Sequence, residues 1–484
     1  MHEAEATTVG HRNAPAAEPV ERRATTKGNS RQPTVGTTQS VKATSSGLPR
    51  IREAARRDSS LRFTNLLHHV TIDLLRRGYL HLNREAASGV DGVTWKAYGQ
   101  GLEVRLADLH ERVHSGRYRA QPSKRIWLPK PDGRRRPIGI ASVEDKVVQQ
   151  ALVWVLESIY ERDFLGFSYG FRPGRHAHQA LDAVFVAITQ RKVNWVLDAD
   201  IKSFFDTLDH AWVLKFLQHR VADRRIVRLV RKFLRAGVSE EGKWSRTEAG
   251  TPQGGVLSPL LANLYLHYVF DQWVHVWRRR HARGEVYVVR YADDFVVCFQ
   301  YEQDGRRFAR ALAERLSKFK LTLHPEKTRL IDFGRFAASN RQRRGRGKPP
   351  TFDFLGFTHI CGKRRSDGRF ALRRQSVSKR VTARLRHIRR MLMRGRARPV
   401  ARQGRWLRAV VTGFFNYHAV PGNSQAMSLF RKEVNRAWLR ALRRRSQKGS
   451  RLTWQRMQRL IATWIPRSHI RHPYPNRRFA MNLR

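Results

Sequence analysis

The segment from residue 286 to residue 299 constrains the fold most, because two apolar runs enclose a pair of adjacent carboxylates. Residues 286–291 and 295–299 are mostly β-branched or aromatic, and Ala292-Asp293-Asp294 separates them. Two such runs joined by a short break predict a β-hairpin with carboxylates at its tip. Two like charges held there would repel unless a cation lies between them. The alternative is an ordinary turn, because Asp is common in turns.

A second apolar run, residues 195–201, carries two more carboxylates. It predicts a strand, and the two-residue period of a strand puts Asp198 and Asp200 on one face. Asp209 is better explained as the N-cap of the helix that follows it. Carboxylates that converge from a strand and a hairpin tip suit Mg²⁺, which prefers oxygen ligands and binds alongside substrate phosphates. Two such ions can activate a 3′-hydroxyl and stabilise a leaving pyrophosphate.

The charge balance indicates a polyanionic partner. The chain has 95 Lys and Arg against 39 Asp and Glu, a formal net charge of +56, and its 41% hydrophobic content is typical of a globular protein. Nucleic acid is the natural partner for such a surplus. A basic membrane-surface protein is the alternative, but the sequence has no run of about 18 apolar residues and no lipidation signal. Paired carboxylates in so basic a chain point to a nucleotide polymerase without a membrane partner.

Two cysteines, Cys298 and Cys361, lie far apart in apolar or strand-like segments. They support neither a disulfide framework nor a zinc site, so a reducing compartment is expected. Residues 1–6 lack the basic and apolar regions of a secretory signal. We therefore expect a cytoplasmic protein.

Changes in composition divide the chain into four parts. Residues 1–58 are rich in Ala, Thr, Ser, Gly, Pro and Arg, which predicts a disordered basic tail. Residues 59–122 show apolar side chains at helical spacing and predict an N-terminal helical extension. Residues 123–370 mix short apolar runs with long helical stretches, which favours an α+β fold over a doubly wound sheet. Residues 371–484 hold 30 Lys and Arg but only one acidic residue, Glu433, and predict a cationic helical domain that binds phosphates.

Ordered motifs across residues 61–484 resemble those of reverse transcriptases, and the Ala in Tyr291-Ala-Asp-Asp294 is similar to the bacterial group II intron type. The blocks that resemble the fingers and palm motifs, in the family's order, are residues 126–140, 168–175, 200–206, 251–259, 325–328 and 354–357. Residues 413–417 and 470–475 are similar to the thumb or maturase domain. The paired cysteines of the endonuclease that many relatives carry are missing, so the resemblance is to an endonuclease-less type, whose members prime from other DNA 3′ ends.

This resemblance implies a right-hand polymerase fold, with fingers and palm around an antiparallel sheet followed by an α-helical thumb. It implies an RNA-directed DNA polymerase that also binds its group II intron RNA as a maturase, in the cytoplasm of a bacterium. Asp200, Asp293 and Asp294 would be the catalytic carboxylates that hold two Mg²⁺ ions. Residues 59–122 would grip the template and intron RNA, and a DNA primer or target would be the other partner.

The resemblance also implies a pocket for the incoming dNTP. Phe205 matches the steric-gate position, where an aromatic face selects against a ribose 2′-hydroxyl. Phe204 and Phe205 would point opposite ways on an extended chain, so one of them is core. Gln253, in a turn rich in Gly and Pro, resembles a residue that lines the nucleotide pocket, although a simple lead-in to a helix is the alternative. Lys327 lies in a matching block without an assigned physical role.

Two cations of the fingers could close over the triphosphate. Lys130 and Arg136 flank the turn at residues 131–133 and are the candidates. The neighbouring Arg125, Arg134 and Arg135 compete for that role.

Two other functions stay open on the sequence alone. One is an RNA-binding splicing factor without polymerase activity, against which the intact Asp200, Asp293, Asp294, Phe205 and Gln253 argue. The other is a reverse transcriptase domesticated for DNA repair or phage defence. A structured intron RNA around the gene would indicate a mobile element, and its absence would favour the domesticated enzyme. The oligomeric state does not follow from the sequence.

Overall fold

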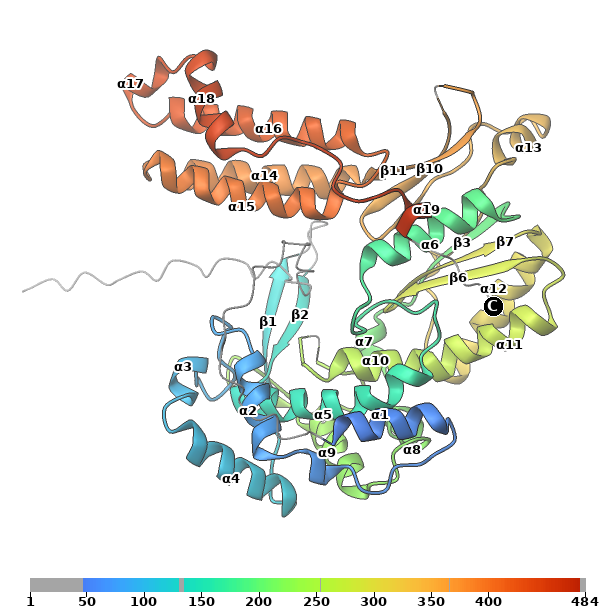
Figure 1. Ribbon diagram of the computed structural model, residues 1–484, viewed down its shortest axis with the longest axis vertical. Helices are drawn as coiled ribbons and strands as arrows, with labels where there is room; N and C mark the ends of the chain where they lie inside the picture. Colours follow the sequence, from blue (N-terminus) through green and yellow to red (C-terminus); the bar gives the residue numbers. More distant parts are fainter. Residues whose placement is uncertain (1–46, 130–134, 253, 365, 479–484) are drawn as a thin grey trace, which may run out of the picture. The chain divides into compact units, whose positions relative to one another are not determined.

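The structure, a computed structural model, describes residues 47–129, 135–252, 254–364 and 366–478 (Figure 1). These residues all belong to one compact unit. Their strands form three sheets with helices packed against them, which confirms the predicted α+β class. In the same ranges, no helix is both long enough and apolar enough to cross a membrane.

The first sheet, which we call the palm sheet, has the strand order β6-β7-β3-β8. Every neighbouring pair in it is antiparallel. The predicted hairpin is present as β6 and β7, and the predicted strand that carries Asp198 and Asp200 is β3. The bounds are Trp195–Asp200 for β3, Val286–Tyr291 for β6, Asp294–Phe299 for β7 and Arg329–Asp332 for β8.

Both faces of the palm sheet are covered by helices. From one face, Phe295, Val297 and Phe299 of β7 join the same buried cluster as Phe308 and Leu312 of α12 (Glu302–Lys318). From the other face, the alternate residues Val296 and Cys298 join a second cluster with Leu181 and Val184 of α6 (Ala177–Gln190). Burial on both sides explains why β7 is an almost continuous apolar run.

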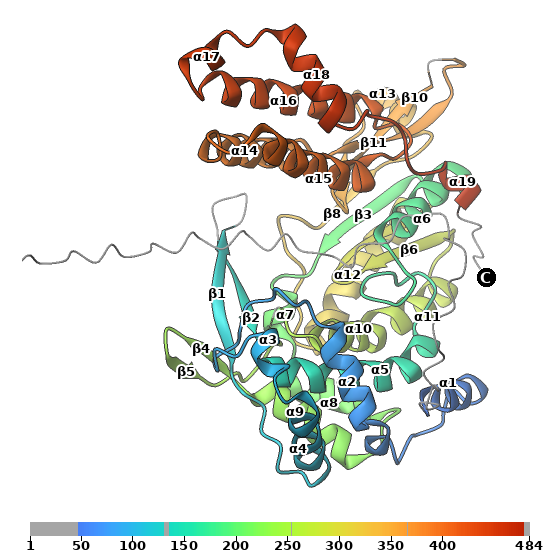
Figure 2. The same cartoon turned by 60° about the vertical axis from the view of Figure 1, so that its left-hand side comes forward.

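The second sheet, which we call the fingers sheet, has the order β2-β1-β4-β5 (Figure 2). The antiparallel β1 and β2 form the expected hairpin, whose turn at residues 130–134 lies outside the described residues. A parallel contact joins β1 to β4. The bounds are Ser123–Pro129 for β1, Arg135–Ile140 for β2, Val238–Glu240 for β4 and Lys243–Ser245 for β5.

Helix α5 (Val143–Asp163) forms the centre of the N-terminal half, because most of its residues are buried. It contacts α2 (Ile72–His81), α10 (Ser258–Leu266) and α1 (Leu48–Arg57). The prediction of a disordered tail over residues 1–58 is wrong for α1, whereas residues 1–46 lie outside the described residues. The apolar pattern of α1 is too short to stand out, but Ile51 and Ala55, one turn apart, are buried.

The third sheet, β11-β10-β9, precedes a group of cationic helices. Its strands are β9 (Phe352–Phe354), β10 (Phe357–Lys363) and β11 (Phe370–Ser376). The helices α14 (Ser378–Arg394), α15 (Val400–His418), α16 (Ser424–Arg443) and α18 (Trp454–Trp464) share a buried core that includes Ile388, Leu407, Trp438 and Ile461. Arginines cover the outer faces of α14, which agrees with the expected helical cationic region.

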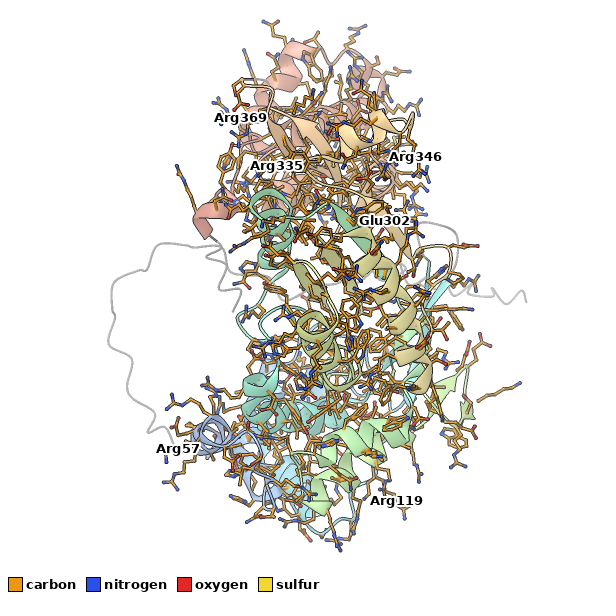
Figure 3. The ribbon with its side chains drawn as sticks, turned by 90° about the vertical axis from the view of Figure 1, so that its right-hand side faces the viewer. Arg57, Arg119, Glu302, Arg335, Arg346 and Arg369 are labelled. Carbon is orange, nitrogen blue, oxygen red and sulfur yellow. The ribbon has the colours of Figure 1, made fainter. Side chains whose placement is uncertain are left out.

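Exposed arginines are spread widely over the described surface, as the labelled Arg57, Arg119, Arg335, Arg346 and Arg369 illustrate (Figure 3). The remaining elements connect the three sheets. They are a 3₁₀ turn at Leu67–His69, α3 (Trp95–Tyr98), α4 (Leu102–His114), α7 (Phe204–Thr207), α8 (His210–Gln218), α9 (Arg224–Arg235), a π-helical turn at His267–Asp271, α11 (Gln272–Arg280), α13 (Ala337–Arg343), α17 (Gln447–Ser450) and α19 (Pro475–Arg478).

Candidate active site

The tip of the β6–β7 hairpin brings three carboxylate-bearing residues to one end of the palm sheet. Tyr291 and Asp294 are paired across the hairpin, so Ala292 and Asp293 form its two-residue loop. Asp294 is also paired with Asp200 on the neighbouring strand β3. The structure therefore brings together Asp200, Asp293 and Asp294, which the sequence predicted from two separate motifs.

The tip has an unusual backbone conformation. Ala292 has a φ of 58°, in the left-handed region that few residues other than glycine adopt. Strain of this kind costs about 1–3 kcal/mol and persists only where surrounding contacts hold it. A Cβ added to Gly170 would lie 2.2 Å from the Ala292 nitrogen, so the loop at Gly170 packs directly against the tip.

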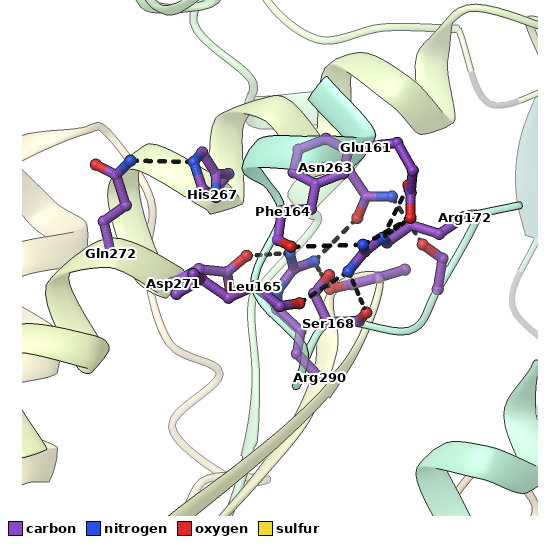
Figure 4. Close-up of polar contacts among 12 residues, drawn as sticks. Glu161, Phe164, Leu165, Ser168, Arg172, Asn263, His267, Asp271, Gln272 and Arg290 are labelled. Atoms are coloured by element: carbon purple, nitrogen blue, oxygen red, sulfur yellow. Dashed lines mark hydrogen bonds and ion pairs between the residues drawn. The ribbon is translucent and has the colours of Figure 1, made fainter. Parts of the chain in front are cut away.

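A buried polar network of Arg290, Asp271 and Asn263 contacts the backbone of the tip, and these side chains are labelled in Figure 4. Arg290 Nη1 donates to the Ala292 carbonyl at 3.0 Å and to Asn263 Oδ1 at 3.0 Å, and Arg290 Nε donates to Asp271 Oδ1 at 2.7 Å. Asn263 Nδ2 in turn donates to the Gly170 carbonyl at 2.7 Å. The side chains of Arg290 and Asp271 are both fully buried. Sequence reasoning missed this network, although a charged residue in the apolar run 286–291 was a signal that could have found it.

Burial and neighbouring carboxylates raise the pKa of the two aspartates at the tip. Burial, followed by the charges of Asp293, Asp198 and Asp200, raises the pKa of Asp294 to about 7. Burial and the charge of Asp200 also raise the pKa of Asp293, whereas the Arg136 and Arg290 cations lower it. Without a cation at the tip, the Asp294 carboxyl of the folded protein therefore keeps its proton up to near pH 7, and it must release this proton when a metal binds.

We expect Asp294→Asn to stabilise the metal-free protein at about pH 8. The raised pKa means that the folded state holds this proton more tightly than the unfolded state, so Asp294 costs stability progressively from about pH 4 to pH 7, and the cost stays at its maximum above that range. Asparagine cannot ionise and removes the cost. Thermal melts should show a gain in Tm of about 2 °C or more at high pH. The gain should shrink towards pH 4, and a gain of the same size at every pH would contradict this assignment.

Asp198 and Asp200 have different partners. Asp198 accepts from Arg329 of β8 at 3.3 Å, a contact that ties two neighbouring strands together. Asp200 forms an ion pair with Lys327, whose ammonium contacts its Oδ2. The sequence alone assigned Lys327 no role. The structure shows that its ammonium contacts Asp200, one of the candidate metal ligands. Asp209 caps α8 through the Trp212 amide at 3.0 Å, as predicted.

The tip suits a divalent metal by its donor chemistry. The charge of Asp200 raises the pKa of both Asp293 and Asp294, so the three carboxylates lie close together, and hard oxygen donors of this kind are what Mg²⁺ binds. Among the described residues, no three His, Cys, Asp or Glu side chains are already converged on one point. The Lys327 ammonium already contacts Asp200, so a metal bound by this carboxylate would have to displace it.

The two phenylalanines after β3 occupy different environments. The expectation of an extended chain is wrong, because Phe204 and Phe205 begin the short helix α7. Phe204 is 2% exposed and belongs to the core, whereas Phe205 is half-buried at its edge. This difference leaves Phe205 as the ring that a substrate could reach.

Backbone contacts connect Phe205 with the segment that contains the expected pocket residue Gln253. The Thr251 amide donates to the Phe205 carbonyl at 2.8 Å. A Cβ on Gly254 would lie 2.8 Å from the Gly139 carbonyl of β2, so Thr251 contacts α7 and Gly254 lies against the fingers sheet. Gln253 itself lies outside the described residues.

Of the two candidate triphosphate cations, one can be placed. Arg136 lies on β2 opposite Leu128, and its charge lowers the pKa of Asp293. The competing Arg125 is paired with Glu240 at 3.5 Å. Lys130 and Arg134 lie outside the described residues.

Comparison with known proteins places the chain in a family. A family model described as "Reverse transcriptase (RNA-dependent DNA polymerase)" matches residues 128–359. Protein YkfC of Escherichia coli K12 is 33% identical over 310 residues, which cover 56% of this chain and 81% of that protein. The group II intron-encoded protein LtrA of Lactococcus lactis is 33% identical over 229 residues, 47% of this chain and 38% of LtrA.

A plant relative shares the same core. The mitochondrial nuclear intron maturase 2 of Arabidopsis thaliana is 28% identical over 174 residues, 27% of this chain and 23% of its own length. The chain thus spans most of YkfC but less than half of LtrA and of this maturase. The matches, the palm sheet and the aspartate-bearing hairpin agree: the chain belongs to the reverse transcriptase family, among the group II intron reverse transcriptases and maturases.

Proposed function

We propose that this RNA-directed DNA polymerase extends a DNA primer with two Mg²⁺ ions held by Asp200, Asp293 and Asp294. The pairing of Asp200 with Asp294 next to the loop residue Asp293 carries the proposal. The bound ions would supply Lewis-acid activation of the primer 3′-hydroxyl and of the leaving pyrophosphate. The chain itself holds the carboxylates at a fixed tip, through Arg290 and the loop at Gly170.

The incoming dNTP would lie between the palm and fingers sheets. Arg136, together with Lys130, would contact the triphosphate, and Gln253 would line the pocket beside Phe205. The hydrogen bond from Thr251 to Phe205 and the close approach of Gly254 to Gly139 support this arrangement.

The family binds RNA and DNA, and the cationic parts of the chain are suited to both. We assign the fingers and palm to residues 123–370, the extension that grips RNA to residues 59–122, and the thumb that binds group II intron RNA to residues 371–484. The surplus of 30 Lys and Arg over one acidic residue in the last region supports phosphate contacts along its helices.

Primer extension on an RNA template with dNTPs and Mg²⁺ tests the proposal. The wild-type protein should extend the primer, and the Asp293→Asn variant should not. Intron splicing assistance by both proteins without any DNA synthesis would replace this proposal with the splicing-factor function.

We expect Phe205→Ala to reduce discrimination against ribonucleotides by about ten-fold or more, because the ring that would contact a 2′-hydroxyl is gone. Single-nucleotide incorporation of dATP and ATP measures the ratio of kcat/KM. The matched control is Phe204→Ala, which should keep the discrimination while lowering stability by about 3–5 kcal/mol, since Phe204 is core. Unchanged discrimination in the Phe205 variant would assign the gate elsewhere.

A further inference from the structure

A pocket of about 680 Å³ lies apart from the three carboxylates. Its walls come from the helices α1, α2 and α5 and from the segment between Phe164 and Arg175. Pockets of about 300–1,000 Å³ accommodate small molecules. Its volume is therefore sufficient for one nucleotide, and what distinguishes it is the kind of side chain that lines it.

The lining is rich in arginine and holds more arginines than acidic residues. Arg52, Arg77 and Arg162 are exposed and form no ion pair with any described residue. The pocket has two glutamates. Glu161 is bound by Arg172 at 2.7 Å, and burial raises the pKa of Glu157 to about 7, which reduces its negative charge at neutral pH. The unpaired guanidinium groups favour a phosphate, which they can bind through charge-assisted hydrogen bonds.

The lining has two aromatic residues, the half-buried Trp154 and the buried Phe164. Trp154 of α5 is half-buried, and the Arg77 guanidinium carbon lies 5.5 Å from the centre of its ring. Aromatic rings and arginine planes are the surfaces on which proteins stack the bases of single-stranded RNA. Phosphate-binding arginines beside such a surface match the two halves of a nucleotide.

We propose that this pocket binds one nucleotide of a single-stranded RNA, with the phosphate on Arg52 and Arg162 and the base against Trp154 and Arg77. The proposal rests on the proposed RNA-dependent function, which supplies RNA as the natural source of the nucleotide. A free mononucleotide shares this chemistry and is separated from RNA by the experiment below.

The wall of the pocket is connected to the hairpin tip through hydrogen bonds and packing contacts of one segment, residues 164–175 (Figure 4). Arg172, 7% exposed, donates through Nη1 to the carbonyls of Leu165 at 2.8 Å and Ser168 at 2.7 Å. The next amide, that of Tyr169, donates to the Arg290 carbonyl at 2.8 Å. Gly170 then packs against Ala292. A nucleotide in the pocket would thus contact the same segment that packs against the tip.

Photochemical crosslinking of the full chain tests the site. The protein carries Asp293→Asn, so that labelling does not depend on DNA synthesis. One probe is a single-stranded RNA with 5-iodouridine, and the other is 8-azidoadenosine 5′-monophosphate. We expect the RNA to label the α5 peptide that contains Trp154. Arg52→Ala combined with Arg162→Ala should lower that labelling by about ten-fold, because two charge-assisted contacts are lost.

Arg310→Ala is the matched control, since Arg310 is an exposed arginine on α12 outside the pocket. It should leave labelling of the α5 peptide unchanged. Labelling by the mononucleotide but not by RNA would overturn the assignment to RNA, and labelling of α5 by neither probe would overturn the site. A failure of the polymerase proposal would instead appear in primer extension by the wild type, so the two failures are distinguishable.

Discussion

Asp293→Asn should lower the rate of primer extension by about 10³-fold or more, which corresponds to about 4 kcal/mol of lost transition-state stabilisation. The substitution keeps the size of the side chain and removes one charged oxygen ligand from the tip. Since the reaction develops charge on phosphate oxygens and on the 3′-oxygen, most of the rate enhancement must come from metal and positioning. Single-turnover extension of a DNA primer on an RNA template, at saturating dNTP and Mg²⁺, measures the effect.

Two controls separate chemistry from folding and binding. Asp108→Asn replaces a carboxylate on α4, far along the chain from the tip. The Asp108 side chain is 60% exposed, so this variant should extend the primer like the wild-type protein. RNA affinity of the Asp293 variant should be close to that of wild type, because the cationic surface is unchanged. An Asp293 variant that extends within a few-fold of wild type would remove this residue from the active site.

Arg290→Met should destabilise the protein by about 3–5 kcal/mol, because it leaves the fully buried Asp271 carboxylate without its partner. Methionine approximates the length of the arginine stem but cannot donate to Asp271, Asn263 or the Ala292 carbonyl. The Ala292 carbonyl at the strained tip also loses its hydrogen-bond donor. DNA synthesis should therefore fall by about 10²-fold, the loss expected when a catalytic group is displaced by about 1 Å. Denaturant unfolding and primer extension measure the two effects.

The double variant Arg290→Met with Asp271→Leu distinguishes stability from positioning. Removing both charges leaves no unpaired carboxylate in the core, so most of the lost stability should return. DNA synthesis should stay low, because the Ala292 carbonyl is still without its donor. If the double variant recovers both stability and activity, Arg290 has no positioning role beyond its ion pair.

The sequence predicted the elements that depend on local pattern. The apolar runs around Ala292-Asp293-Asp294 became β6 and β7, and the period of two on β3 placed Asp198 and Asp200 as expected. The cap at Asp209 followed from the preference of Asp for a helix N-terminus. Local pattern failed at α1 and at α7, where a short helix is stabilised by packing rather than by its own residues.

Other parts of the site could not be read from the sequence because they depend on contacts between distant residues. Lys327 meets Asp200 across 127 positions of chain, and Asn263 donates to the Gly170 carbonyl across 93 positions. No local propensity encodes such pairings.

The amino-acid sequence by itself determined the α+β class, the aspartate-bearing hairpin and the polyanionic partner, because strand period, turn chemistry and net charge are local or additive properties. Only the tertiary structure decided that Phe204 is core while Phe205 is half-buried at its edge, that Arg290 and Gly170 hold the strained tip, and that several arginines line one pocket together with Trp154. These features arise from burial and from the meeting of distant segments, which exist only once the chain has packed.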